Sequence, residues 1–232
     1  MNTPAPLTLL CAALALAACG QSPQTAPEAA PEPAAPPPPQ ADAAAPPSAD
    51  SPHDAFLDRL RSHCGQAYAG RIVANQPPQP DDAFEGKALV MHVRECGQTE
   101  VKVPFHVGDD HSRTWVLTRT ATGLRLKHDH RHEDGSDDAV TMYGGDTAAP
   151  GTPQRQEFPV DAESVAMFER EGLTASVTNT WAMEIEPGQR FLYELSRPGG
   201  RLFQVEFDLA TPVDLPPTPW GHAELVAPQS AR

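Results

Sequence analysis

Basic residues are scarce in this sequence. Lys and Arg together number 17 against 31 Asp and Glu, which gives a formal net charge of −14 at pH 7. Residues 1–52 hold only four of these acids and no base, so the remainder of the chain is itself acidic. Nucleic acids and anionic lipid headgroups are bound by clustered Lys and Arg. The composition therefore argues against direct binding to either.

Short motifs that mark common enzyme classes are missing as well. The sequence has no H-E-x-x-H zinc motif, no G-x-S-x-G nucleophile motif and no G-x-x-x-x-G-K-[ST] phosphate loop. It also lacks any C-x-x-C spacing, which disfavours a cysteine-held zinc ion. Catalytic groups can still converge from distant positions, because geometry and not sequence order defines an active site. A binding or interaction role is nevertheless the better default.

The N-terminal residues 1–18 have no apolar run long enough to span a membrane. Their shorter apolar run, residues 7–18, is typical of a secretory signal, which we predict to be residues 1–18. The run ends in Leu-Ala-Ala-Cys at Leu16–Cys19, which resembles the lipobox of bacterial lipoproteins. The resemblance implies that Cys19 is lipidated and becomes the mature N-terminus. An ordinary cleaved signal peptide is the alternative.

The residue after Cys19 is Gly20. In lipoproteins an aspartate at this position tends to retain the protein in the inner membrane. The resemblance therefore implies a lipid-anchored protein of the cell envelope, in the outer membrane facing the periplasm rather than in the inner membrane. Membrane association is expected to come from the anchor at Cys19 alone.

Composition divides the rest of the chain. Residues 19–52 consist almost wholly of Ala, Pro, Gln, Ser and Thr, and cannot bury enough apolar surface to offset the entropy lost on ordering. We predict that they form a disordered tether. Residues 53–212 suffice for one folded domain. The Pro-rich residues 213–232 are expected to be a loosely held tail, in which Trp220 is a candidate for docking.

Cysteines are few. Cys11 leaves with the predicted signal and Cys19 is the predicted lipid site, so Cys64 and Cys96 remain. An even pair in an oxidising compartment predicts a disulfide. It would close a loop of roughly 30 residues and stabilise the fold by on the order of 3–4 kcal/mol in the chain-entropy model. Two buried free thiols are the alternative.

Apolar residues of the domain recur mainly with period two, which is typical of half-buried strands. Residues 100–107, for example, place Val, Val, Phe and Val on one face, and Pro104 on the other face indicates an edge position or a bulge. Residues 54–62 and 161–171 predict short helices, the second capped by Asp161. Strands are predicted at residues 66–74, 87–96, 100–107, 113–120, 124–133, 140–143, 174–185, 190–195 and 201–209.

Strands joined by hairpin turns predict an all-β fold. We expect an antiparallel up-and-down barrel of about eight to ten strands with one or two short helices, because closure hides the sheet edges. A β-sandwich is the alternative. The outline resembles the calycin group of small barrels in architecture alone, since the G-x-W motif of that group is absent near the first strand.

Residues 124–133 combine architecture with chemistry. Leu124, Leu126, His128, His130 and His132 fall on one face of a strand, because side chains alternate between faces. The leucines mark this face as the inward one, so three imidazoles would face one end of the core. Neutral imidazole is the commonest protein ligand for zinc, and a haem is a second candidate cofactor. A solvated strand end whose imidazoles bond to nearby carboxylates is the other interpretation.

Two functions remain open. In the first, the chain is a non-enzymatic envelope lipoprotein, a monomer whose domain binds a small molecule or a partner, and His128, His130 and Tyr143 contact the ligand. Tyr143 is included because the Gly-Gly after it indicates a close backbone approach.

In the alternative, the chain is a zinc-dependent hydrolase. His128, His130 and His132 would hold the metal, and Asp134 or Asp138 would activate water. The HDHRHEDG run of residues 128–135 also resembles a family of bacterial envelope lipoproteins, and that resemblance implies the compartment without implying a function.

Overall fold

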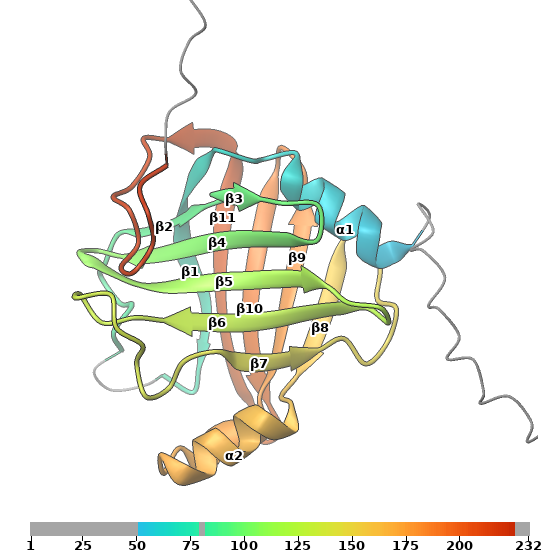
Figure 1. Ribbon diagram of the computed structural model, residues 1–232, viewed down its shortest axis with the longest axis vertical. Helices are drawn as coiled ribbons and strands as arrows, with labels where there is room; N and C mark the ends of the chain where they lie inside the picture. The colour runs from blue at the N-terminus through green and yellow to red at the C-terminus, as the bar shows by residue number, and fades with distance from the viewer. Residues whose placement is uncertain (1–50, 79–81, 226–232) are drawn as a thin grey trace, which may run out of the picture. The chain divides into compact units, whose positions relative to one another are not determined.

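The structure, a computed structural model, describes residues 51–78 and 82–225 (Figure 1). The predicted signal peptide, the lipidation site Cys19 and the tether up to residue 50 lie outside the described residues. Within the described part, the predicted barrel is confirmed and the alternative, a β-sandwich, is excluded. The chain forms an all-β, antiparallel, up-and-down barrel that is nearly closed, with two short α-helices.

The strands follow one another around the barrel almost in chain order. The sheet order is β7-β6-β5-β4-β2-β1-β11-β10-β9-β8, and the two-residue β3 pairs with β4 beyond the end of β2. The strands are β1 (Ala67–Gln76), β2 (Leu89–His92), β3 (Glu95–Cys96), β4 (Glu100–Val107), β5 (Asp110–Arg119), β6 (Leu124–His130), β7 (Tyr143–Asp146), β8 (Arg155–Pro159), β9 (Thr180–Glu186), β10 (Arg190–Arg197) and β11 (Arg201–Val213).

Pairing of the first strand with the last brings the two halves of the barrel together. β1 and β11 are antiparallel neighbours over most of their length. The remaining opening lies between β7 and β8, where the Asp161 N–H donates to the Gly144 carbonyl at 2.9 Å. Ser164 also bonds to both backbone groups of Gly144. These hydrogen bonds thus join β7 to the segment that follows β8, across the opening of the barrel.

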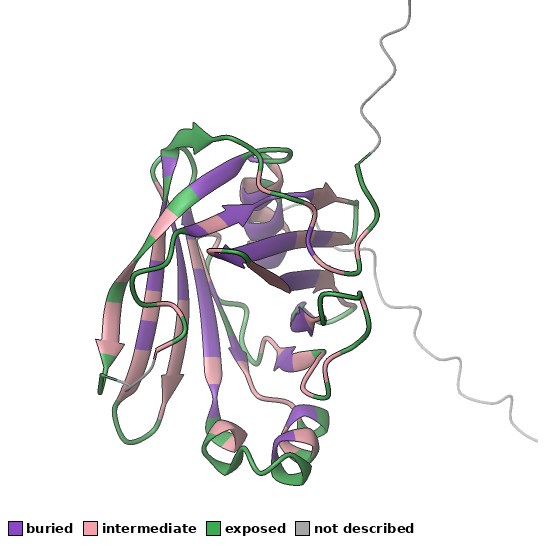
Figure 2. Cartoon of the chain, turned by 90° about the vertical axis from the view of Figure 1, so that its left-hand side faces the viewer, coloured by how far each residue is buried: buried purple, intermediate pink, exposed green. Residues whose placement is uncertain are grey.

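Aromatic rings fill the interior. Phe105 stacks on Trp115 with centroids 5.0 Å apart, and Trp115 stacks on Tyr193 at 4.5 Å. Phe207 meets Phe105 edge-on at 5.6 Å. Each such side chain contributes roughly 1.5–3 kcal/mol when it is fully buried. Figure 2 shows that buried positions follow the strands, whereas the turns are largely exposed.

Pro104 is accommodated by a bulge in an interior strand. Met91 pairs with Phe105 and Glu95 pairs with Lys102, so one extra residue fits between β2 and β3 opposite Pro104. Proline has no N–H to donate to a ladder, and the interruption removes the need for one. Of the two sequence interpretations, the bulge is the one found.

The helix α1 (Pro52–Arg61) and the disulfide cover one end of the barrel. Phe56, Leu57 and Leu60 are fully buried there, as the helical spacing predicts. Cys64, in the turn after α1, is bonded to Cys96 in β3, and the predicted disulfide is confirmed. Neither helix of the described residues is long and apolar enough to cross a membrane.

The helix α2 (Ala162–Arg170) lies at the other end (Figure 1). Its N-cap is Asp161, as predicted, which accepts a hydrogen bond from Ser164 N–H at 2.8 Å. Asp161 also accepts a bond from the buried Lys127 ammonium at 2.8 Å, so β6 holds the start of the helix. A short 3-10 helix, η1 (Thr174–Thr178), follows where a strand was predicted to begin.

Two segments near the opening differ from the sequence prediction. The strand predicted at residues 140–143 is instead β7, which begins at Tyr143 and continues through Gly144 and Gly145, and β8 was not predicted. The two glycines are needed for close packing: a Cβ on Gly144 would lie 1.9 Å from the Leu126 carbonyl oxygen, and one on Gly145 would lie 1.8 Å from that of Pro159. The close backbone approach that the Gly-Gly pair indicated is therefore present, between strands.

The described part of the tail, residues 214–225, is held at several points. The Trp220 N–H donates to the His111 carbonyl at 3.1 Å, and its ring meets the His111 ring edge-on. His222 lies 3.6 Å from both Glu95 and Asp129. The tail is thus more closely attached than its proline content indicated.

Candidate functional site

A cavity of about 410 Å³ occupies the end of the barrel next to α2. Its wall comes from the first residues of β5, β7, β9 and β11 and the last residues of β6 and β10, which all meet at this end because neighbouring strands are antiparallel. Phe168 of α2 and the η1 segment complete it. The apolar part of the wall consists mainly of aromatic rings: Phe84, Phe105, Trp115, Tyr143, Phe168, Trp181, Tyr193 and Phe203.

His128 lines the cavity, and both of its ring nitrogens form hydrogen bonds within the protein. The Nδ1 atom lies 3.1 Å from the Tyr143 carbonyl, which can only accept, so Nδ1 carries the proton and donates. Nε2 therefore accepts from the Tyr193 hydroxyl at 2.9 Å. Burial, with lesser contributions from His130 and Lys127, lowers the pKa of His128 to about 3. The imidazole is neutral, and both nitrogens are occupied.

His130 and Tyr143 line the cavity beside it. The Tyr143 ring stacks on the His128 ring at 4.6 Å, and its hydroxyl lies 3.2 Å from His130 Nε2. Burial lowers the pKa of His130 to about 4 and raises the pKa of the Tyr143 hydroxyl above its usual range. Both side chains are therefore neutral near pH 7. The structure thus brings together the three residues that the sequence assigned to ligand contact.

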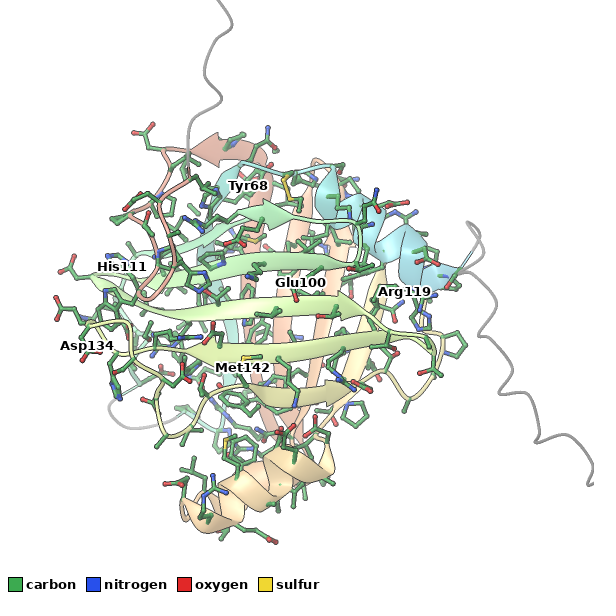
Figure 3. All side chains as sticks on the ribbon, viewed as in Figure 1. Tyr68, Glu100, His111, Arg119, Asp134 and Met142 are labelled. Atoms are coloured by element: carbon green, nitrogen blue, oxygen red, sulfur yellow. A yellow bond between two sulfur atoms is a disulfide. The ribbon has the colours of Figure 1, made fainter. Side chains whose placement is uncertain are left out.

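His132 does not join them. β6 ends at His130, and the chain turns so that the Gly135 N–H donates to the His132 carbonyl, which leaves the His132 side chain exposed. Asp134 lies in the same exposed loop (Figure 3), and its carboxylate accepts from Ser136. Period-two spacing predicts a common face only while the strand continues.

The alternative function requires side chains that can bind a metal ion together. Residues 51–78 and 82–225 contain no group of three or more His, Cys, Asp or Glu that could do so. Of the predicted donors, Asp138 accepts from the Val140 N–H at 2.7 Å. Zinc or haem binding by His128, His130 and His132 stays a prediction from the sequence.

A second set of histidines lies on the outer side of the same sheet. His106 Nδ1 and His111 Nδ1 are 2.7 Å apart, so one of them donates to the other. His92 and His106 are buried, and Nε2 of each has no hydrogen-bond partner among the described residues. Burial lowers the pKa of both to about 4, and the nearby charges of His111 and Arg94 act in the same direction. These groups lie outside the cavity wall.

Three arginines at the cavity were not predicted from the sequence. Arg113, Arg197 and Arg201 all line it, the last two on either side of the turn between β10 and β11. The sequence does contain a signal for this pair, because Arg-Pro-Gly-Gly-Arg is a hairpin turn flanked by like charges. The cavity thus has aromatic walls and cationic groups at its strand ends. No protein-family model matches this chain, and none of the curated proteins or solved structures matches it either.

Proposed function

We propose that this chain is a lipid-anchored protein of the cell envelope whose barrel binds a small molecule without chemically changing it. The observation that carries the proposal is the cavity of about 410 Å³ with aromatic walls. Ligand sites are commonly concave, of about 300–1,000 Å³, mostly apolar and supplied with a few polar groups that orient the ligand. The wall of this cavity has that composition.

The state of the polar groups supports binding over catalysis. His128 donates to a carbonyl and accepts from Tyr193, so its imidazole has no lone pair left to take a proton from a ligand. A general base works best when its pKa is near the working pH. Burial instead lowers the pKa of His130 to about 4. These side chains are suited to forming a fixed wall around a ligand and not to taking a proton from it.

Binding is tested with 2-naphthylmethanol, a neutral planar probe small enough for the cavity. We expect saturable quenching of tryptophan fluorescence and a matching calorimetric isotherm, because Trp115 and Trp181 line the cavity. Leu195→Trp should weaken binding at least about tenfold by filling the cavity, a loss of about 1.4 kcal/mol. Val73→Trp is the matched control, since Val73 is exposed and lies outside the wall. Equal binding by both variants would contradict the proposed site.

The anchor is tested separately. Cys19→Ala should abolish incorporation of labelled palmitate and release the protein from membranes. Cys11→Ala is the control within the same segment, because the lipobox resemblance assigns lipidation to Cys19 and not to Cys11. A Cys19→Ala protein that still fractionates with membranes would show that the anchoring proposal is wrong.

A further inference from the structure

Two positively charged residues are cross-strand neighbours at the cavity. Arg197 ends β10, Arg201 begins β11, and the two residues are directly paired across the strands. Like charges in directly opposed positions destabilise a sheet. Both residues are half-buried and line the cavity. Burial first, and Arg201 second, lower the pKa of Arg197. The two arginines therefore form an unfavourable electrostatic arrangement at this position.

The pair is also unusual in its partners. Every arginine of the described residues except Arg59, Arg197 and Arg201 forms an ion pair with a carboxylate. Acids are abundant in a chain of net charge −14. A shortage of carboxylates therefore does not explain why the two arginines at the cavity pair with none among the described residues.

The partners that the pair does have are neutral. Arg197 donates to the amide oxygen of Asn179 and, at 3.4 Å, to the Ser176 hydroxyl. Arg201 donates through Nη1 to the Asn75 amide oxygen at 2.7 Å and to the carbonyls of residues 76 and 77. These bonds hold the guanidinium groups without neutralising them, so their positive charge remains at the cavity wall.

The remaining charged groups of the wall leave this imbalance in place. Asp82 accepts from the Asn75 amide and from the Phe84 N–H, and it forms no ion pair with a described residue. Arg113 is paired with Asp110 through Nη1 at 2.6 Å. Its guanidinium carbon lies 5.3 Å from the centre of the Phe84 ring. Histidines 128 and 130 are neutral there, for the reasons given above.

Aromatic rings continue the site inward from the charges. The Arg201 guanidinium carbon lies 5.6 Å from the centre of the Phe203 ring, and the Phe203 ring lies 5.0 Å from that of Phe84. Tyr143 and Trp181 form the adjoining wall, with ring centroids 5.7 Å apart. A ligand that satisfied both regions would carry an anionic group at one end and a flat apolar body at the other.

We infer that the ligand of this cavity is an organic monoanion, a carboxylate on an aromatic body, whose charged group is bound between Arg197 and Arg201. The inference rests on the proposed function and specifies its ligand class. Guanidinium groups bind carboxylates through charge-assisted hydrogen bonds, which are stronger than neutral ones. The anion also removes the repulsion between the two arginines.

The experiment compares three probes of the same shape in calorimetric titrations of the full-length protein. These are 2-naphthoate, neutral 2-naphthylmethanol and cationic 2-(aminomethyl)naphthalene. We expect 2-naphthoate to bind about tenfold or more tighter than the alcohol, and the amine to bind weakest. The preference for the anion should shrink as salt rises from 20 to about 500 mM, because ions screen half-buried charges.

Two matched double variants locate the charge effect. Arg197→Gln/Arg201→Gln should bind 2-naphthoate and the alcohol with similar affinity. Arg71→Gln/Arg125→Gln removes the same net charge from arginines outside the cavity wall and should keep the parent's preference. Thermal unfolding checks the fold, and the cavity variant should be at least as stable as the parent because the repulsive pair is gone.

The outcomes separate this inference from the proposed function. If the alcohol binds and the carboxylate binds no better, or if the cavity variant keeps the preference, the assignment of an anionic ligand is wrong and small-molecule binding stands. If none of the three probes binds, the proposed binding cavity and the ligand class both fail. Preference for the anion, lost only in the cavity variant, supports the inference.

Discussion

At the scale of single residues, the wall of the cavity is fixed by hydrogen bonds that leave little choice of protonation state. The carbonyl of Tyr143 requires a proton on His128 Nδ1, and that in turn makes Nε2 an acceptor for the Tyr193 hydroxyl. Burial raises the pKa of Tyr193 well above its usual range, so the hydroxyl keeps its proton. The chain Tyr143–His128–Tyr193 is therefore a neutral, fully satisfied network.

Removing its donor gives a first prediction. Tyr193→Phe deletes the hydroxyl and leaves His128 Nε2 buried without a partner, which should lower the free energy of unfolding by about 1–3 kcal/mol. Tyr143→Phe is the comparison, because its hydroxyl meets His130 at 3.2 Å in a half-buried contact, whereas His128 and Tyr193 are both buried. Urea denaturation of the two variants measures the difference. A larger loss in Tyr143→Phe would contradict the assigned hydrogen-bond directions.

At the scale of elements, the junction of β7 and β8 depends on the absence of side chains. A methyl group on Gly145 would lie 1.8 Å from the Pro159 carbonyl oxygen, so the two strands would have to separate. We predict that Gly145→Ala lowers the free energy of unfolding by more than about 2 kcal/mol through this overpacking. Gly97→Ala is the milder control, with its nearest neighbour at 3.2 Å. Equal stabilities of the two variants in urea would refute the close packing.

The disulfide joins two further elements, the turn after α1 and β3. Its cysteines are 32 residues apart. Closing such a loop restricts the unfolded chain, so Cys64→Ala/Cys96→Ala should lose about 3–4 kcal/mol in the chain-entropy model. Denaturation of the parent with and without reductant provides the matched measurement, because reduction should produce the same loss. A parent protein that is insensitive to reductant would contradict this prediction.

The sequence predicts elements well where one strand carries one clear alternation. The predicted strand at residues 100–107 has the same bounds as β4, because its apolar residues alternate strictly. Prediction fails where distant contacts decide. The strand predicted at residues 140–143 stops before Gly144, yet β7 includes both Gly144 and Gly145, where the nearby Leu126 and Pro159 carbonyls leave room only for glycine.

The site follows the same rule. His128 and His130 share the inward face while β6 lasts, and a local pattern could show this. The approach of α2, of η1 and of the turn carrying Arg197 and Arg201 is set by packing between segments far apart in the chain. Period-two spacing contains no information on those distances, so only the fold shows that the charges flanking the Arg197–Arg201 turn line a cavity.

At the scale of the whole molecule, buried neutral histidines tie stability to pH. Burial is the largest cause that lowers the pKa of four of them, to about 4 for His92, His106 and His130 and about 3 for His128. In the unfolded chain these groups bind protons near pH 6.5. Between that pH and about 4 the unfolded state therefore binds more protons than the folded state, and stability falls as the pH is lowered.

We therefore predict that the protein loses stability on acidification at pH values well above those at which carboxylates titrate. Each histidine contributes a slope of up to about 1.4 kcal/mol per pH unit below pH 6.5. Urea denaturation at pH 7.5 and 5.0 should show a clear loss, and His106→Asn, which removes one titrating group, should reduce it. His132→Gln, at an exposed position, should leave the loss unchanged. Stability that is constant between these pH values would overturn the account.

The helix α1 and the cavity lie at opposite ends of the barrel. Asp54 of α1 pairs with Arg119, the last residue of β5 (Figure 3). Arg113, near the start of the same strand, lines the cavity. The described chain therefore begins at the end of the barrel that lies away from the cavity. A ligand that enters the cavity therefore meets the strand ends next to α2 and not the point where the described chain begins.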